Sequence, residues 1–153
     1  MVVKCNSLGV FDKGGGLSIK YVGDIRNKAS FLEEKGFSMI NIDEYIIEYA
    51  YKNTCLIEIY YGRYSDTADV CIRFENSELS RPEQYSLGWI RNMIRFETGE
   101  KDIFGKFGET ANKLANIISL LEFLNDNFDN ATNIEFCRKI QRKINKNFEK
   151  GVW

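Results

Sequence analysis

The sequence predicts an α+β fold, in which an antiparallel meander packs against helices on one face and two helices form the C-terminal part. Three observations support this. A central stretch alternates apolar and polar residues, later stretches repeat apolar residues at three- and four-residue steps, and short polar turns separate the segments. With 153 residues, 44% of them hydrophobic, the chain can bury one core, so we expect a single domain over residues 1–153.

Two short elements are expected before the sheet. The glycine turn at Gly14–Gly16 leads into Leu17–Val22 (LSIKYV), which predicts a short strand. Residues 27–35 have a helical composition and are followed by Gly36, a residue suited to end a helix.

Three segments after residue 42 have a period of two, which predicts an antiparallel meander. One side of this sheet is apolar and needs a cover. The residues expected on that side are Tyr45, Ile47, Tyr49, Tyr51, Ile57, Ile59, Tyr61, Val70, Ile72 and Phe74. The last two segments are joined through residues 65–68, and we expect Asp66 and Asp69 to hold that turn with side-chain bonds to the backbone.

The helical cover is expected downstream. Ser86–Phe96 predicts a short helix or turn, and Glu109–Phe128 predicts a long helix with apolar residues at helical spacing. A last helix is expected to begin at a capping box, in which Thr132 and Glu135 each satisfy an exposed backbone donor.

The charge is distributed unevenly along the chain. The net charge is −1; residues 135–153 hold six Lys or Arg against two Glu, or +4, so the other 134 residues carry −5. The basic end is interpreted as a solvated helix face, with a nucleic-acid contact as the alternative. The small net charge argues against a protein built mainly to coat nucleic acid.

The residue types limit the catalytic chemistry. The chain has no histidine, so it lacks the commonest general base and the usual partner of serine and cysteine nucleophiles. An enzyme would depend on paired carboxylates, for which Asp66, Asp69 and Glu75 are the candidates. We expect the turn role for the aspartates instead, and no catalysis.

The four cysteines are far apart in the sequence and form no close pair. Zinc sites usually need such pairs, often with histidine, so we expect no metal, no cofactor and reduced thiols at Cys5, Cys55, Cys71 and Cys137. The first residues lack the apolar segment of a signal peptide, and no apolar run approaches the roughly 20 residues that span a bilayer. We therefore expect a cytoplasmic protein without membrane contact.

Several stretches together resemble a family of bacterial immunity proteins that are encoded beside polymorphic or contact-dependent toxins. The resemblance covers roughly residues 31–148 and depends most on Tyr61–Val70 (YGRYSDTADV) and Ser86–Arg91 (SLGWIR). It implies a protein without catalytic activity that binds the toxin domain encoded by the adjacent gene, such as a nuclease, and blocks it stoichiometrically. No residue of the motifs carries over as an established toxin contact.

A cationic toxin surface would attract carboxylates on such a protein. The acidic candidates for toxin interaction are Asp43, Glu44, Glu48, Glu58, Asp66 and Asp69. Arg63 and Tyr64 are further candidates, because arginine and tyrosine are enriched in binding hot spots. For these two residues, a role in bracing the fold is the slightly favoured interpretation. The alternatives to an immunity protein are a carboxylate-dependent hydrolase and a nucleic-acid-binding adaptor that uses the basic C-terminal helix.

Overall fold

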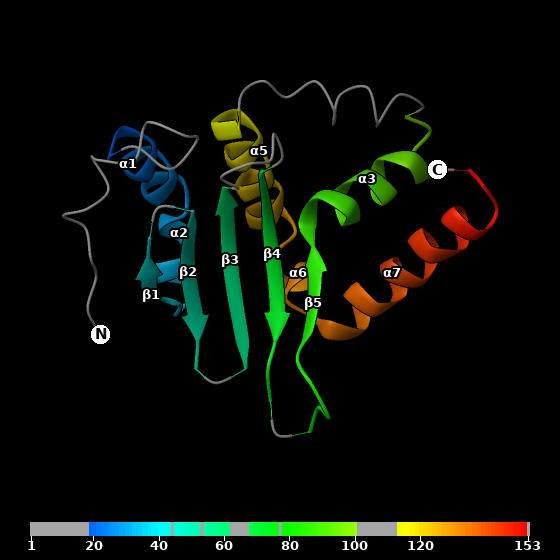
Figure 1. The fold of residues 1–153 in the computed structure, drawn as a ribbon, viewed down its shortest axis with the longest axis horizontal. Helices are drawn as coiled ribbons and strands as arrows, with labels where there is room; N and C mark the ends of the chain where they lie inside the picture. The colour runs from blue at the N-terminus through cyan, green and yellow to red at the C-terminus, as the bar shows by residue number, and fades with distance from the viewer. Residues whose placement is uncertain are drawn as a thin grey trace.

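Five antiparallel strands lie side by side in their order along the chain, as the computed structural model shows (Figure 1). The structure describes residues 19–43, 45–52, 54–61, 68–76, 78–100 and 113–152. The strands are β1 (Ser38–Ile42), β2 (Ile46–Tyr51), β3 (Cys55–Tyr61), β4 (Ala68–Phe74) and β5 (Glu83–Ser86). This sheet and its helices confirm the predicted α+β class and the meander.

The inner face of the sheet is built from β-branched and aromatic residues in register. Ile47 pairs with Ile59, which pairs with Val70, and all three side chains are fully buried. The next row joins Tyr49, Ile57 and Ile72 in the same way. Each of the buried isoleucine and valine side chains stabilises the fold by about 1.5–3 kcal/mol through burial. The period-two prediction therefore assigned the buried side of β2, β3 and β4 correctly.

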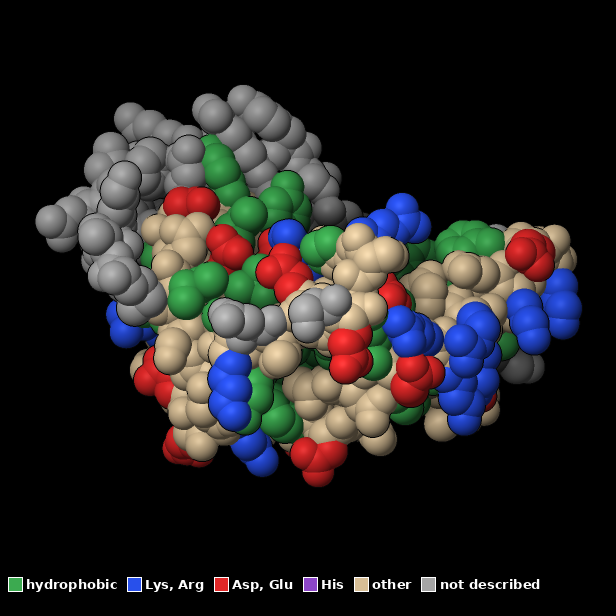
Figure 2. Space-filling view, turned by 90° about the horizontal axis from the view of Figure 1, so that it is seen from below, with side chains coloured by type: hydrophobic (Ala, Val, Ile, Leu, Met, Phe, Trp, Pro, Cys, Tyr) green, Lys and Arg blue, Asp and Glu red, His purple; other side chains and the backbone are tan. Residues whose placement is uncertain are grey.

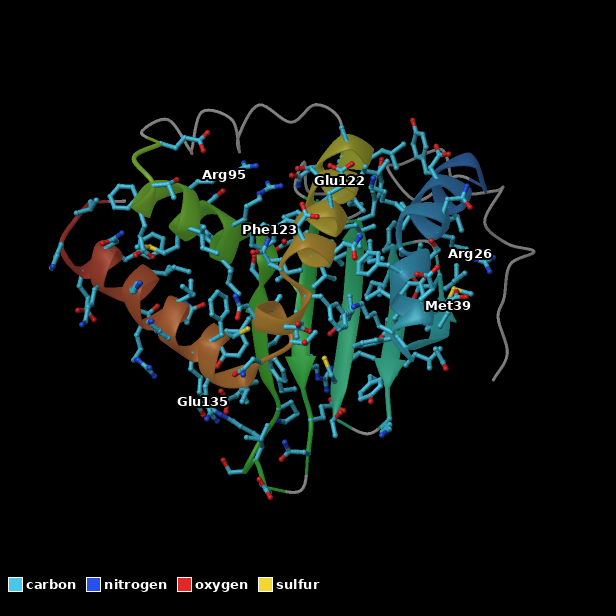
Figure 3. All side chains as sticks on the ribbon, turned by 180° about the vertical axis from the view of Figure 1, so that it is seen from behind. Arg26, Met39, Arg95, Glu122, Phe123 and Glu135 are labelled. Carbon is cyan, nitrogen blue, oxygen red and sulfur yellow. The ribbon has the colours of Figure 1, made fainter. Side chains whose placement is uncertain are left out.

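Four helices cover this inner face (Figures 1 and 3). They are α1 (Ile19–Lys28), α2 (Ser30–Glu34), α5 (Lys113–Asp126) and α6 (Phe128–Ala131). Helix α5 buries Ile117, Leu120, Leu121 and Leu124, which lie at helical spacing. The predicted long helix is thus confirmed over residues 113–126, and residues 109–112 lie outside the described part.

Helices α3 (Leu87–Glu97) and α7 (Ile134–Glu149) pack on one another beside the β5 edge of the sheet (Figure 1). Helix α7 buries Cys137, Ile140 and Ile144. Lys143 Nζ on α7 contacts Glu97 Oε2 on α3 at 2.9 Å. Both predicted helices are confirmed, with α3 beginning one residue after Ser86.

Two local predictions were wrong. Residues 19–22 form the start of α1 and not a strand, because Val22, Ile25 and Ala29 recur at helical spacing and are buried together. The last helix is capped by Asn133, whose Oδ1 accepts hydrogen bonds from the backbone N–H groups of Glu135 and Phe136. The Thr132 hydroxyl instead donates to the Phe128 carbonyl at 2.7 Å.

Candidate functional site

The outer face of the sheet lies opposite the four covering helices (Figures 1 and 3). We use this name for the side chains that alternate with the buried rows. They are Ile46, Glu48, Ala50, Leu56, Glu58, Tyr60, Asp69, Cys71, Arg73, Gln84 and Ser86, with Asn41 beside them on β1. None of them is fully buried.

Two carboxylates lie directly opposite one another at the centre of the outer face. Glu48 of β2 is the register partner of Glu58 of β3. Asn41 Nδ2 donates to Glu48 Oε1 at 2.9 Å. The Arg73 guanidinium lies 4.0 Å from the Glu58 carboxylate and only 2.6 Å from that of Glu75. Its positive charge therefore offsets the negative charge of Glu58 less than that of Glu75. Burial, followed by the charge of Glu48, raises the pKa of Glu58.

Apolar side chains border the two glutamates. Ile46 pairs with Tyr60 and Ala50 pairs with Leu56 across the same two strands. Tyr60 is 41% exposed and is one of four exposed large hydrophobic residues in the described part of the chain. The outer face therefore combines an acidic centre with apolar contact area.

Asp43 has a local structural role close to this face. Its Oδ1 accepts hydrogen bonds from the backbone N–H groups of Tyr45 and Ile46, at 2.8 and 3.0 Å. This geometry is an Asx turn between β1 and β2. The Asp43 side chain is exposed, so it adds negative charge at one end of the outer face.

Asp69 lies within β4, and its hydrogen bonds to the described residues reach β5 and α3 rather than the turn for which it was predicted. It is the second residue of β4, and its carboxylate accepts hydrogen bonds from the Ser86 hydroxyl and from the Gly88 backbone N–H, the latter at 3.1 Å. It also accepts one from the Val70 backbone N–H at 2.8 Å. Burial raises the pKa of Asp69, while these hydrogen bonds lower it. Asp69 therefore joins β4 to the start of α3.

The other candidates from the sequence lie outside the described residues. They are Glu44, Arg63, Tyr64 and Asp66. Among the described candidates, the structure brings Glu48 and Glu58 together and separates Asp69, which turns to β5 and α3.

The structure tests one of the carboxylate pairs that a hydrolase would need, Asp69 with Glu75. Asp69 and Glu75 are six residues apart along one extended segment, or about 20 Å at the usual rise of a strand. Glycosidase carboxylates lie roughly 5–10 Å apart. These two residues do not form such a pair, and pairs that include Asp66 stay a prediction.

A buried arginine that sequence reasoning did not single out links three elements. The Arg91 side chain of α3 is 6% exposed and donates to Ser119 Oγ at 2.8 Å and to Asn116 Oδ1 at 3.4 Å. Asn116 in turn donates to the Ala68 carbonyl at 2.7 Å. Burial lowers the pKa of Arg91 to about 10. Its partners lie 25 and 28 residues away, so no local sequence pattern indicates this network.

The described cysteines Cys55, Cys71 and Cys137 are free thiols, and Cys5 lies outside the described part. Across the described ranges, no three Cys, Asp or Glu side chains gather closely enough to hold a metal ion. Among the helices of those ranges, none is long and apolar enough to cross a membrane. Comparison of the chain with protein-family models, curated proteins and solved structures finds no match.

Proposed function

We propose that this chain is an immunity protein, which binds the toxin domain encoded by the adjacent gene and neutralises it by forming a stoichiometric complex. The observation that carries the proposal is the opposed pair Glu48 and Glu58 on the outer face. The resemblance of Tyr61–Val70 and Ser86–Arg91 to immunity proteins supports the class of partner.

The opposed glutamates are unfavourable for the isolated sheet. Like charges directly opposite one another on neighbouring strands destabilise the pairing. Arg73 compensates only partly, because its closer contact is with Glu75. A lysine or arginine from a partner would remove the repulsion, so the arrangement favours a cationic occupant.

The surroundings of the glutamates fit a protein partner. Interfaces combine apolar area with charged groups, and tyrosine is enriched among the residues that carry binding energy. Tyr60 is exposed, its register partner Ile46 is half-buried, and Leu56 is half-buried on the other side of the glutamates. A toxin domain that acts on nucleic acid presents a cationic surface of the complementary sign.

Rescue of cells that express the toxin tests this function. We expect co-expression of the chain to restore growth, and the double variant Glu48→Lys with Glu58→Lys to restore it poorly. The matched control is Asp126→Lys with Glu149→Lys, which makes the same change in charge at the C-terminal ends of α5 and α7. A cation is favourable at those ends, so the control should fold well and rescue fully. Undiminished killing in the presence of the wild-type chain would contradict the proposal.

A second candidate function, nucleic-acid binding, is supported by the solvent-exposed side of α7. Exposed cations follow it at three- and four-residue steps, opposite its buried face, and Figure 2 shows Lys and Arg gathered over this region. They are Lys139, Arg142, Lys146 and Lys150. Steps of this size place them about 4.5–6 Å apart along the helix, which suits contact with a phosphate backbone.

The nucleic-acid candidate makes a separate prediction. Binding to a mixed-sequence RNA should weaken as salt increases and should weaken further in Arg142→Glu with Lys146→Glu. The control Arg26→Glu with Lys52→Glu makes the same change in charge at two exposed cations elsewhere. An equal loss in both variants would indicate a general effect of charge and contradict a role for α7.

A further inference from the structure

A pocket of about 360 Å³ opens at the end of the sheet where β2 finishes and β3 begins. Figure 2 is viewed toward this end of the molecule. The described residues that line the pocket come from the loop after α2, from strands β2–β4 and the turns that follow them, and from the start of α6 and α7. The lining residues are Lys35, Phe37, Tyr51, Thr54, Cys55, Phe74, Asn76, Phe128, Thr132 and Ile134. The outer-face glutamates are not among them.

Three aromatic rings form a fixed wall of the pocket. The Phe37 ring lies 5.3 Å from the Tyr51 ring and 6.0 Å from the Phe128 ring, the latter in an edge-on arrangement. Gly36 has a φ of 97° and lets the chain pass close to the Tyr51 ring. Phe37 is itself buried in the core, so the wall is formed before any ligand arrives. Such a wall suits a flat aromatic group.

The pocket lining includes one cation, Lys35, and one side-chain amide, Asn76. Lys35 Nζ lies 5.1 Å from the centre of the Phe128 ring. Asn76 Oδ1 accepts from the backbone N–H groups of Glu78 and Leu79, and the same side chain carries two amide hydrogens that can donate to a ligand. Burial raises the pKa of Cys55 to about 12, which keeps the thiol neutral. The described lining contains a cation and an amide donor but no carboxylate.

We propose that this pocket binds a small aromatic carboxylate, with its ring against Phe37, Tyr51 and Phe128 and its carboxylate toward Lys35 and Asn76. The volume lies within the range of roughly 300–1,000 Å³ that is typical of small-molecule sites. Apolar walls with a few polar groups that fix orientation are also typical of such sites. This inference is independent of toxin binding, because it uses other residues.

Titration calorimetry with 2-naphthoate on the full chain tests the proposal. We expect saturable 1:1 binding, and a weaker response to 2-naphthamide, which has the same ring system without the charge. Lys35→Met should weaken naphthoate binding about tenfold and leave naphthamide binding unchanged. The matched control is Lys52→Met, because Lys52 Nζ also lies 5.1 Å from an aromatic ring, that of Tyr51, but does not line the pocket.

A pocket-filling variant tests the location. Ile134→Trp at the start of α7 places a larger side chain in the space and should abolish binding of both compounds, while an unchanged urea midpoint shows that the variant folds. Absence of saturable naphthoate binding to the wild-type chain would overturn the proposal. Undiminished binding by Ile134→Trp, or equal losses in Lys35→Met and Lys52→Met, would overturn it as well.

Discussion

The carboxylate of Asp69 in β4 accepts a hydrogen bond from the backbone N–H of Gly88 in the first turn of α3, at 3.1 Å. Ser86, the residue that caps α3, donates its hydroxyl to the same carboxylate and accepts from the Trp89 backbone N–H. The two stretches on which the predicted family resemblance depends, Tyr61–Val70 and Ser86–Arg91, therefore meet at Asp69. This contact gives Asp69 a role in fixing the start of α3 on the sheet.

Asp69→Ala is expected to lower the free energy of unfolding by about 2–3 kcal/mol, because hydrogen bonds to a charged group are lost and a backbone donor stays unpaired. Urea denaturation measures the change. The control Asp43→Ala removes an exposed aspartate that also accepts two backbone hydrogen bonds, and should cost about 1 kcal/mol or less. Equal effects of the two variants would show that the link to α3 contributes little.

Glu58→Gln is expected to stabilise the isolated chain by about 0.5–1 kcal/mol at pH 7, because it removes the like charge opposite Glu48. The pKa of Glu58 is raised in the folded state. The folded chain therefore binds a proton at Glu58 more tightly than the unfolded chain does. The stabilising contribution of the protonated form is present below the unfolded pKa and is lost as pH rises through the folded value. Urea midpoints measured from pH 3 to pH 7 should show the advantage of the variant growing with pH. A variant less stable than wild type at pH 7 would contradict the interpretation.

The ion pair between Glu83 of β5 and Arg138 of α7 should make the fold sensitive to acid. Arg138 donates to both Glu83 oxygens at 2.9 and 2.6 Å, and these bonds lower the pKa of Glu83 from 4.5 to about 2. The stability contributed by ionised Glu83 is present above the unfolded pKa and is lost as pH falls from about 4.5 through about 2.

Arg138→Met is therefore expected to flatten the decrease in urea midpoint over that acid range. The control Lys139→Met removes a neighbouring exposed cation for which the described residues provide no ion pair. The control should retain the wild-type dependence on pH. If Arg138→Met retained it too, the ion pair would not be a source of acid sensitivity.

Gly36→Ala is expected to destabilise the fold more than Gly99→Ala. Both glycines have positive φ values, of 97° and 93°, so both variants carry the backbone strain of about 1 kcal/mol or more. An added Cβ at Gly36 would lie 3.0 Å from Tyr51 Cε2, whereas one at Gly99 meets no atom within 4 Å. The difference between their unfolding free energies isolates the Tyr51 contact, and a difference of zero would mean that the ring moves aside freely.

Long segments with a clear period were predictable, and short or ambiguous ones were not. The alternation in β2, β3 and β4 is sustained, so their buried side followed from sequence. Strands β1 and β5 have five and four residues, too few for a period to stand out. The apolar β-branched residues around position 19 indicated a strand locally, whereas the burial of Val22 and Ile25 at helical spacing decides for a helix.

The candidate site was predictable as residues but not as an arrangement. Glu48 and Glu58 could be named from their charge, whereas their opposition depends on the register of β2 and β3. Asp69 was assigned to a turn because aspartate favours turns. Two of its partners, Ser86 and Gly88, are 17 and 19 residues away, and only the meeting of β4, β5 and α3 brings them within reach.

The most direct measurement of the central claim is a calorimetric titration of the purified toxin domain from the adjacent gene with this chain. We predict a 1:1 complex whose affinity falls at least about tenfold, or ~1.4 kcal/mol, in Glu48→Lys with Glu58→Lys. Asp126→Lys with Glu149→Lys should bind like the wild-type chain. Absence of a complex with the wild-type chain would contradict the proposed function, and full affinity of the Glu48 and Glu58 variant would contradict docking on the outer face.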